Sequence, residues 1–169
     1  DTGDWIHSSV AISKGIVYFG SRNGNFYALD AIKGKEIWKY YVGDWILSSP
    51  AVYNDTVYFG DGGAFYALDA RNGNLKWKFE TKLAVWSSPA VCGGTIYFGS
   101  HDRNLYAVDT KTGQEKWRFR TEGPIEISPT IYDNTIYFGN NYGFFYALDA
   151  KTGKEIWRFK VDDQISTSP

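Results

Sequence analysis

The sequence predicts an all-β fold made of repeated four-stranded units, the blades of a β-propeller. A tryptophan follows a glycine by four residues in every copy of the repeat. No window keeps an apolar period of 3.6 residues, which argues against helices. A period near 40 residues with strand-like content is typical of propeller blades. The repeat is easiest to see in a motif of two aromatic residues and a glycine: Tyr18-Phe19-Gly20, Tyr58-Phe59-Gly60, Tyr97-Phe98-Gly99 and Tyr137-Phe138-Gly139.

Each repeat divides into four short runs of β-branched and aromatic residues. Glycine, asparagine and aspartate separate the runs, as in an antiparallel meander. In the third repeat the runs are residues 88–92, 95–100, 105–109 and 114–119. We therefore expect one propeller segment over residues 1–169. Its predicted blades are residues 1–41, 42–80, 81–120 and 121–160, and residues 161–169 begin a fifth repeat.

An aspartate and a glycine recur around the turn between the third and fourth runs. A carboxylate at the start of a tight turn can accept a backbone N–H, and glycine tolerates the positive φ that such turns require. Their fixed place in every repeat favours a structural role over metal or acid chemistry. The aspartates are Asp30, Asp69, Asp109 and Asp149, and the glycines are Gly34, Gly73, Gly113 and Gly153.

The tryptophan of the fourth run stands among charged residues in every repeat. Charged side chains on an edge strand discourage pairing with other chains, so this run is predicted to be the outermost strand. The four residues are Trp38, Trp77, Trp117 and Trp157.

The segment Ala-x-Asp-x-x-x-Gly-x-x-x-Trp, from Ala28 to Trp38 and its three equivalents, resembles the tryptophan-docking motif of the pyrroloquinoline-quinone-like (PQQ-like) β-propeller repeat family. The resemblance covers essentially the whole chain. It implies blades around a central axis, with each motif tryptophan packed against a neighbouring blade. Rings of this family usually have six to eight blades. Four repeats therefore imply an arc of a longer propeller, with a ring of two chains as the alternative.

The resemblance leaves two functions open. The quinoprotein dehydrogenases of the family hold their cofactor with a disulfide between adjacent cysteines, calcium ligands and a catalytic aspartate. Cys92 has no second cysteine to pair with, so the resemblance to non-catalytic members, of the BamB type or the sensor type, is closer. It implies an extracytoplasmic scaffold without cofactor or metal that binds a protein or a glycan. The alternative is a fragment of a PQQ-dependent dehydrogenase whose cofactor site lies outside this segment.

The composition of the chain excludes some classes of partner. The formal net charge is −1 and the basic residues are spread along the chain, so no basic surface is available to hold a nucleic acid. No apolar run approaches the roughly 20 residues of a membrane span. A protein partner, self-association or the further blades of a longer chain remain.

Two features that look chemical have simpler interpretations. Ser100-His101-Asp102 resembles a catalytic triad, but adjacent residues of one loop cannot align as nucleophile, base and orienting group. Cys92 takes an apolar strand position that holds Ile12, Tyr53 and Tyr132 in the other repeats. A buried structural cysteine is the favoured interpretation there, and a reactive thiol the alternative.

Residues that differ between the repeats are where a specific function must lie. They cluster in the segment that enters the first strand and in the loop between the second and third strands. One entry position stays aliphatic and is predicted to be core: Ile6, Ile46, Val85, Ile125 and Ile165. Three further tryptophans in the entry segments either fill contacts between blades or form an aromatic surface for a partner. The candidate partner-binding residues are Trp5, His7, Trp45, Trp86, Glu126, Arg22, Arg103 and Tyr142.

Overall fold

The computed structural model describes residues 2–162 and 165. Within this part of the chain there are four antiparallel four-stranded sheets and no helix. The first sheet contains β1 (Ala11–Ser13), β2 (Ile16–Gly20), β3 (Asn25–Asp30) and β4 (Glu36–Tyr41). The second contains β5 (Ala51–Tyr53), β6 (Thr56–Gly60), β7 (Ala64–Asp69) and β8 (Leu75–Glu80). The third contains β9 (Ala90–Cys92), β10 (Thr95–Gly99), β11 (Asn104–Asp109) and β12 (Glu115–Arg120). The fourth contains β13 (Thr130–Tyr132), β14 (Thr135–Gly139), β15 (Phe144–Asp149) and β16 (Glu155–Lys160).

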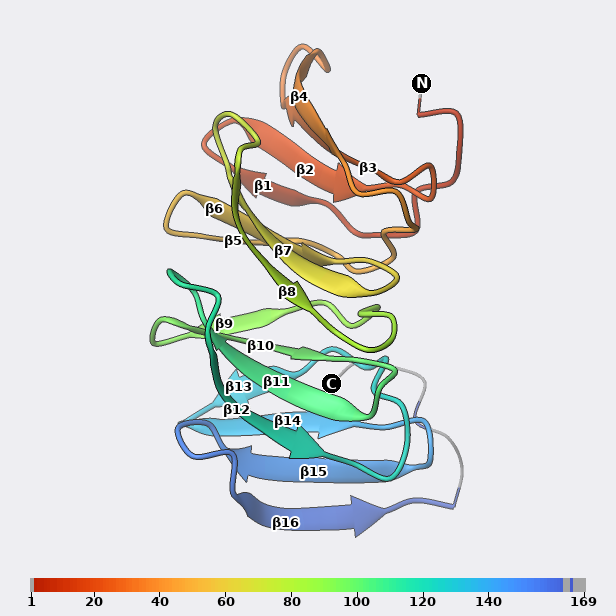
Figure 1. The fold of residues 1–169 in the computed structure, drawn as a ribbon, viewed down its shortest axis with the longest axis vertical. Coiled ribbons are helices and arrows are strands. Elements are labelled where there is room, and N and C mark those ends of the chain that lie inside the picture. The colour runs from red at the N-terminus through yellow and green to blue at the C-terminus, as the bar shows by residue number, and fades with distance from the viewer. Residues whose placement is uncertain (1, 163–164, 166–169) are drawn as a thin grey trace.

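The four sheets follow one another along the long axis of the molecule (Figure 1), with the first sheet at one end and the fourth at the other. Neighbouring sheets are in contact through their first strands, β1 with β5, β5 with β9 and β9 with β13. Strands pair in sequence order within each sheet, so the tryptophan-bearing fourth strand is always at an edge. The predicted blade architecture is therefore confirmed, and the sheets form an open stack.

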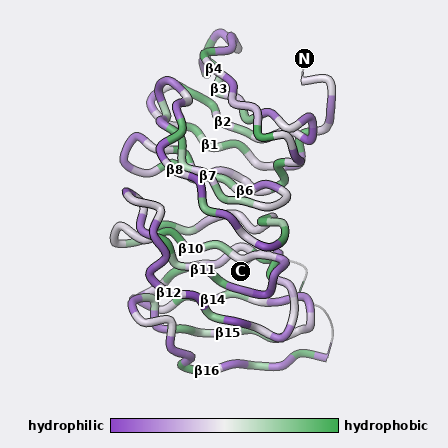
Figure 2. Tube along the Cα trace, in the orientation of Figure 1, coloured by the Kyte–Doolittle hydropathy of each residue, from purple (hydrophilic) through white to green (hydrophobic). Residues whose placement is uncertain are grey.

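The hydrophobic core lies between successive sheets, which explains why the middle strands are the most apolar (Figure 2). Phe26 of β3 stacks on Phe59 of β6, with ring centroids 4.0 Å apart and planes at 8°. Phe65 and Phe98 repeat this contact between the next two sheets, again at 4.0 Å. Offset stacking of this kind adds about 0.5–1.5 kcal/mol to the burial of each pair.

Three of the motif tryptophans, Trp38, Trp77 and Trp117, dock onto the following sheet. Trp77 is only 8% exposed, and its Nε1 donates a hydrogen bond to Thr110 O at 3.0 Å. The hydroxyl of Tyr58 donates to the same carbonyl at 3.1 Å. Equivalent bonds run from Trp38 to Ala70 O at 3.1 Å and from Trp117 to Ala150 O at 3.2 Å. Each following sheet thus covers the indole with apolar surface and supplies a carbonyl that accepts the indole N–H.

The turn that precedes each fourth strand has the predicted chemistry. The Asp109 carboxylate accepts hydrogen bonds from the amides of Lys111 and Thr112, both at 3.0 Å. The Thr112 amide, the largest cause, holds the pKa of this carboxyl below its ordinary value. Asp30, Asp69 and Asp149 make the same pair of bonds. The turn glycines have φ values of 64°, 74°, 72° and 70° at Gly34, Gly73, Gly113 and Gly153.

The segment that enters each sheet ties it to the sheet before. Ile46 is fully buried, and a Cβ at Gly20 would lie 2.1 Å from its Cγ2. This close approach requires glycine at the end of the second strand. Two residues further on, the Ser48 hydroxyl donates to Gly60 O at 3.0 Å and accepts from Gly60 N at 2.7 Å. The entry segment therefore bridges two successive sheets.

Two predictions about buried positions need correction. Ile6 is 47% exposed although Ile46, Val85 and Ile125 are fully buried, because among the described residues no sheet precedes it to supply the glycine that those residues cover. Cys92 is exposed. It is the last residue of the three-residue strand β9 and pairs with Thr95 across a two-residue turn, so it lies at the end of a hairpin where little packs on it.

Candidate partner-binding rim

Most of the candidate binding residues lie on one rim of the stack. This loop rim consists of the loops between the second and third strands, at the right of Figure 1, and the entry segments beside them. In three repeats a backbone hydrogen bond joins loop and entry segment: Arg22 N to Trp5 O at 3.0 Å, His101 N to Ala84 O at 2.9 Å and Asn141 N to Pro124 O at 3.0 Å. The strand framework therefore holds the variable residues of each repeat at equivalent places.

The first half of the loop rim is aromatic and cationic. The guanidinium of Arg22 lies near two indoles, its Cζ 3.9 Å from the ring centroid of Trp45 and 5.5 Å from that of Trp5. The Trp5 ring in turn lies 5.6 Å from the His7 ring. His7, Arg22, Trp45 and Leu47 line an open cavity of about 380 Å³. Trp5 and Trp45 are exposed, so they do not fill a contact between sheets.

The second half of the loop rim is a polar cluster. His101 packs its ring edge-on against Trp86, with centroids 4.2 Å apart. Its Nε2 lies 3.1 Å from Glu126 Oε1 without the alignment of a hydrogen bond. Asn141 Nδ2 donates to the same carboxylate oxygen at 2.7 Å. The cluster joins the third and fourth repeats, and its charged member is Glu126.

The remaining two candidates lie in the loops of the rim but belong neither to the group around Arg22 nor to the cluster around Glu126. Arg103 is exposed and has a positive φ of 74°, and its carbonyl accepts the amide of Thr121 at 2.8 Å. Tyr142 is exposed and its ring lies over Gly123, where a Cβ would come within 2.7 Å of Tyr142 Cγ. The structure therefore groups Trp5, His7, Arg22 and Trp45, connects Trp86 to Glu126 through His101, and leaves Arg103 and Tyr142 apart.

Sequence reasoning missed a set of tyrosine hydroxyls bonded to carboxylates below the loop rim. Tyr66 OH donates to Asp61 Oδ2 at 2.8 Å, and Tyr106 OH donates to Asp102 Oδ2 at 2.6 Å. Burial, the largest cause, and the adjacent carboxylate raise the pKa of both hydroxyls far above the ordinary value of 10.0. The tyrosine recurs in every repeat, but its acceptor changes position and type, so the repeat pattern gave no signal for the pair.

The triad-like run does not converge. Ser100 Oγ donates to Leu83 O at 3.0 Å, Asp102 accepts from Tyr106, and His101 faces Glu126. Its three side chains thus have three separate sets of partners, as expected for an ordinary loop. Within residues 2–162 and Ile165, no group of three or more histidine, cysteine, aspartate or glutamate side chains could hold a metal ion.

The fold and the docking tryptophans define the class of the protein as a segment of a PQQ-like β-propeller. Residues 2–118 and 80–169 match a family described as outer membrane protein assembly factor BamB. The chain belongs to this family. Among curated proteins, no sequence matches it. In the part of the chain that the structure describes, no helix is long and apolar enough to cross a membrane.

The chain matches parts of larger solved propellers. BamB from Moraxella catarrhalis has a TM-score of 0.83 and 26% sequence identity over 94% of this chain and 51% of its own. The chain therefore spans about half the length of that protein. Two dehydrogenases share the fold. A quinohemoprotein alcohol dehydrogenase from Comamonas testosteroni has a TM-score of 0.84 and 20% sequence identity, over 95% of this chain and 35% of the dehydrogenase. A europium-containing methanol dehydrogenase has a TM-score of 0.80 and 17% identity, over 90% of this chain and 41% of the dehydrogenase.

Proposed function

We propose that this chain is part of a non-enzymatic propeller scaffold that binds a protein partner through the loop rim. The family description, which refers to outer-membrane assembly, supports a role outside the cytoplasm. The single observation that carries the proposal is the exposed aromatic and cationic group of Trp5, Arg22 and Trp45 on one rim. Tryptophan and arginine are the residues most enriched at binding hot spots, and nothing in the strand framework requires them there.

The residues of the loop rim do not fit a calcium-bound quinone. In its second half the carboxylate of Glu126 already faces His101 and Asn141, and those of Asp102 and Glu122 accept tyrosine hydroxyls. The single cysteine, Cys92, lies at a hairpin end and cannot form a disulfide within the chain. A dehydrogenase whose cofactor site lies outside this segment is the competing function, because dehydrogenases share the fold.

We also propose that residues 1–169 are an arc whose fifth repeat begins near residue 161. A Cβ at Gly139 would lie 3.2 Å from Ile165 Cδ1. Ile165 thus covers the glycine of the fourth sheet, as Ile46 covers Gly20 of the first. The matching Ser168 and Pro169 lie outside the described residues. The repeat boundaries at residues 1–41, 42–80, 81–120 and 121–160 are part of this proposal.

The binding function is tested by panning a random dodecapeptide phage library on the protein. The selected peptides are then measured against Trp45→Ala and Trp86→Ala, after circular dichroism has shown that both variants fold. We expect at least one rim variant to weaken binding tenfold or more. The matched control is Ile32→Ser, because Ile32 is almost fully exposed in the turn at the other end of the strands.

Peptides that bind both rim variants as well as the unaltered protein would overturn the proposal, as would peptides that are lost only with Ile32→Ser. The enzymatic alternative has its own test, an absorbance titration with PQQ and Ca²⁺. We expect no stoichiometric binding. A stoichiometric complex with dehydrogenase activity would establish the alternative.

A further inference from the structure

We propose that Arg22, which lies over the indole of Trp45 and near that of Trp5, binds the carboxylate of an acidic side chain on the partner. This inference rests on the proposed partner-binding function and adds the chemistry that the partner must present. It concerns the first half of the loop rim, where the cavity of about 380 Å³ is lined by His7, Arg22, Trp45 and Leu47.

Contact with the Trp45 ring positions the guanidinium of Arg22. The Cζ of Arg22 lies 3.9 Å from the Trp45 ring centroid, so the planar group lies against an aromatic face. Its N–H donors lie in the guanidinium plane and form a fork that matches a carboxylate in a bidentate arrangement. A group held in this way loses less conformational entropy on binding than a free side chain does.

Arg22 differs from the arginines that stabilise the sheets. Arg118 and Arg158 are paired with Glu115 and Glu122, at 2.8 Å and 2.7 Å. Within residues 2–162 and Ile165, no carboxylate lies within ion-pair distance of Arg22, although the side chain is half-buried. A cation that is partly removed from water gains more from a counter-ion than an exposed one does.

Asp4 and Asp44, the acidic residues that directly precede the two tryptophans, each accept a backbone hydrogen bond. Asp4 Oδ1 accepts the backbone N–H of Trp5 at 2.7 Å, and Asp44 Oδ1 accepts that of Trp45 at 2.7 Å. Both carboxylates therefore hold the entry segments that carry the two indoles. They shape the walls of the site and leave the guanidinium for an external acceptor.

The cavity favours a single carboxylate attached to an apolar neighbour. It offers one guanidinium, the imidazole of His7, an indole wall from Trp45 and the aliphatic side chain of Leu47. One fixed cation balances one negative charge, and the apolar walls bury methylene groups or an adjacent hydrophobic residue. At the far end of the loop rim Glu126 is itself acidic, which orients an acidic partner segment toward the first repeat.

The test is a chemical-shift titration of the protein with short synthetic peptides. The probe is Ac-Gly-Phe-Glu-Phe-Gly-NH₂, compared with the same peptide carrying glutamine and a terminal amide. A third peptide carries glutamine and a free terminal carboxylate. We expect the glutamate peptide to bind at least tenfold tighter than both others. Arg22→Gln should abolish this preference, and Arg22→Lys, which keeps the charge but not the planar fork, should restore only part of it.

Arg120→Gln is the matched control, because Arg120 is an exposed arginine on the outer strand β12; it should keep the full preference. Equal binding of the glutamate and amidated glutamine peptides overturns the inference, as does an equal loss with Arg120→Gln. Tight binding of the peptide with the free carboxylate would assign the site to a chain terminus instead and would also overturn it. If Trp45→Ala weakens all peptides alike without a glutamate preference, the partner-binding function stands and this inference fails. If no rim variant changes any binding, both fail.

Discussion

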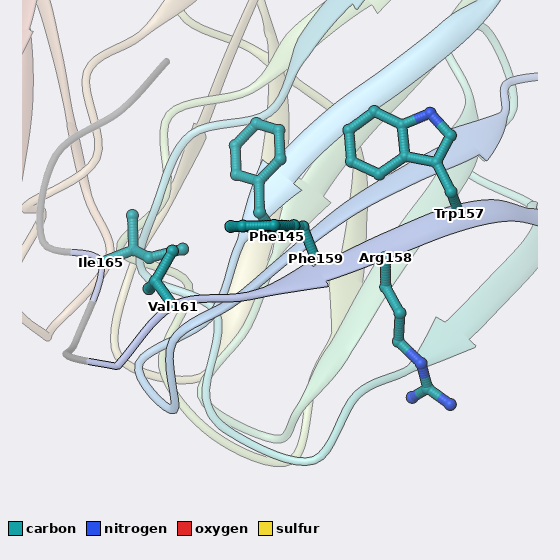
Figure 3. A pocket seen from close by; sticks show the side chains of 6 residues that line it. All are labelled: Phe145, Trp157, Arg158, Phe159, Val161 and Ile165. Carbon is teal, nitrogen blue, oxygen red and sulfur yellow. The ribbon is translucent and has the colours of Figure 1, made fainter.

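Trp77 and Trp157 stand at the same place in their repeats but in different surroundings. Trp77 is 8% exposed and packs on the third sheet, whereas Trp157 is 44% exposed at the end of the stack. Phe65 stacks on Phe98 of the next sheet, whereas in the part of the chain that the structure describes no further sheet lies against its equivalent Phe145. Together with Phe159, Val161 and Ile165, Phe145 and Trp157 line an open apolar hollow of about 590 Å³ (Figure 3).

The comparison separates what a repeat determines by itself from what it needs from its neighbour. The distance between the Tyr137 and Trp157 ring centroids, 6.0 Å, is close to the 5.8 Å between Tyr58 and Trp77. The motif therefore sets the position of the indole within its own sheet. Burial and the hydrogen bond from Nε1 come only with the next sheet. An unpaired face of this kind is a site where another blade is expected to bind.

The largest expected effect separates the two tryptophans. Trp77→Ala should lower the free energy of unfolding by about 3–5 kcal/mol, because it empties a packed interface. Trp157→Ala removes a half-exposed ring and should cost about 1 kcal/mol or less. Urea denaturation followed by circular dichroism measures both. Equal losses, or a loss below about 1 kcal/mol at Trp77, would show that the docking interpretation is wrong.

The turn glycines allow a second comparison at constant backbone geometry. A Cβ at Gly113 would lie 2.8 Å from Trp77 Cγ, whereas none of the atoms that the structure describes lies within 4 Å of a Cβ at Gly34. Both glycines have positive φ. Gly34→Ala should therefore cost about 1–2 kcal/mol from backbone strain alone. Gly113→Ala should cost about 1–3 kcal/mol more, because it also displaces the docked indole.

Thermal unfolding of the two alanine variants measures this difference. Combining Gly113→Ala with Trp77→Ala provides the control, since the clash cannot occur without the indole. The double variant should then lose less stability than the sum of the losses of the two single variants. Full additivity would mean that Gly113 serves only the turn.

The open face itself should drive association. Sedimentation velocity of the 169-residue chain should show concentration-dependent association or poor solubility. Trp157→Glu places a charge on the exposed apolar face and should weaken association at least tenfold, which corresponds to about 1.4 kcal/mol. Ile32→Ser, which removes an exposed apolar side chain at a turn, should leave it unchanged. A monodisperse monomer at high concentration would contradict the proposal of an arc with uncovered ends.

Much of the fold could be predicted because the same sequence pattern occurs in all four repeats. The turn aspartates, the turn glycines and the outer strand each follow from local chemistry that recurs. Ile6 and Cys92 could not be placed correctly, because their burial depends on what lies beside them. Equivalent residues have equal burial only where their neighbours are the same, and among the described residues no sheet stands before the first one.

The candidate site was only partly predictable. The variable positions lie on the loop rim, since strand residues are fixed by packing and loop residues are not, and their role in binding stays a prediction. The stacking of Arg22 on Trp45 joins residues of two different repeats, so spacing within one repeat could not show it. The same holds for Glu126, whose partner His101 belongs to the preceding repeat.

The smallest expected effect concerns Glu122. Its carboxylate accepts the tyrosine hydroxyl of the fourth sheet, as those of Asp61 and Asp102 do in the second and third sheets. Glu122 accepts hydrogen bonds from the Tyr146 hydroxyl and from Arg158 Nη1. The tyrosine bond, the largest cause, lowers the pKa of the Glu122 carboxyl below its ordinary 4.5. A lowered folded-state pKa stabilises the protein above the unfolded value, and this contribution disappears as the pH falls through the folded-state pKa.

At pH 7, Glu122→Gln should therefore destabilise the protein by less than about 1 kcal/mol, because nearly half of the Glu122 side chain is exposed and solvent screens the interaction. The difference from the unaltered protein should shrink as the pH is lowered from about 6 to about 3, as the carboxyl takes up its proton. Urea denaturation across this range measures it. Glu80→Gln is the control, since Glu80 is exposed and paired only with Lys78 at 2.7 Å among the ion pairs of the described residues. A difference at Glu122 that stays constant with pH would show that the side chain acts by packing and not by charge.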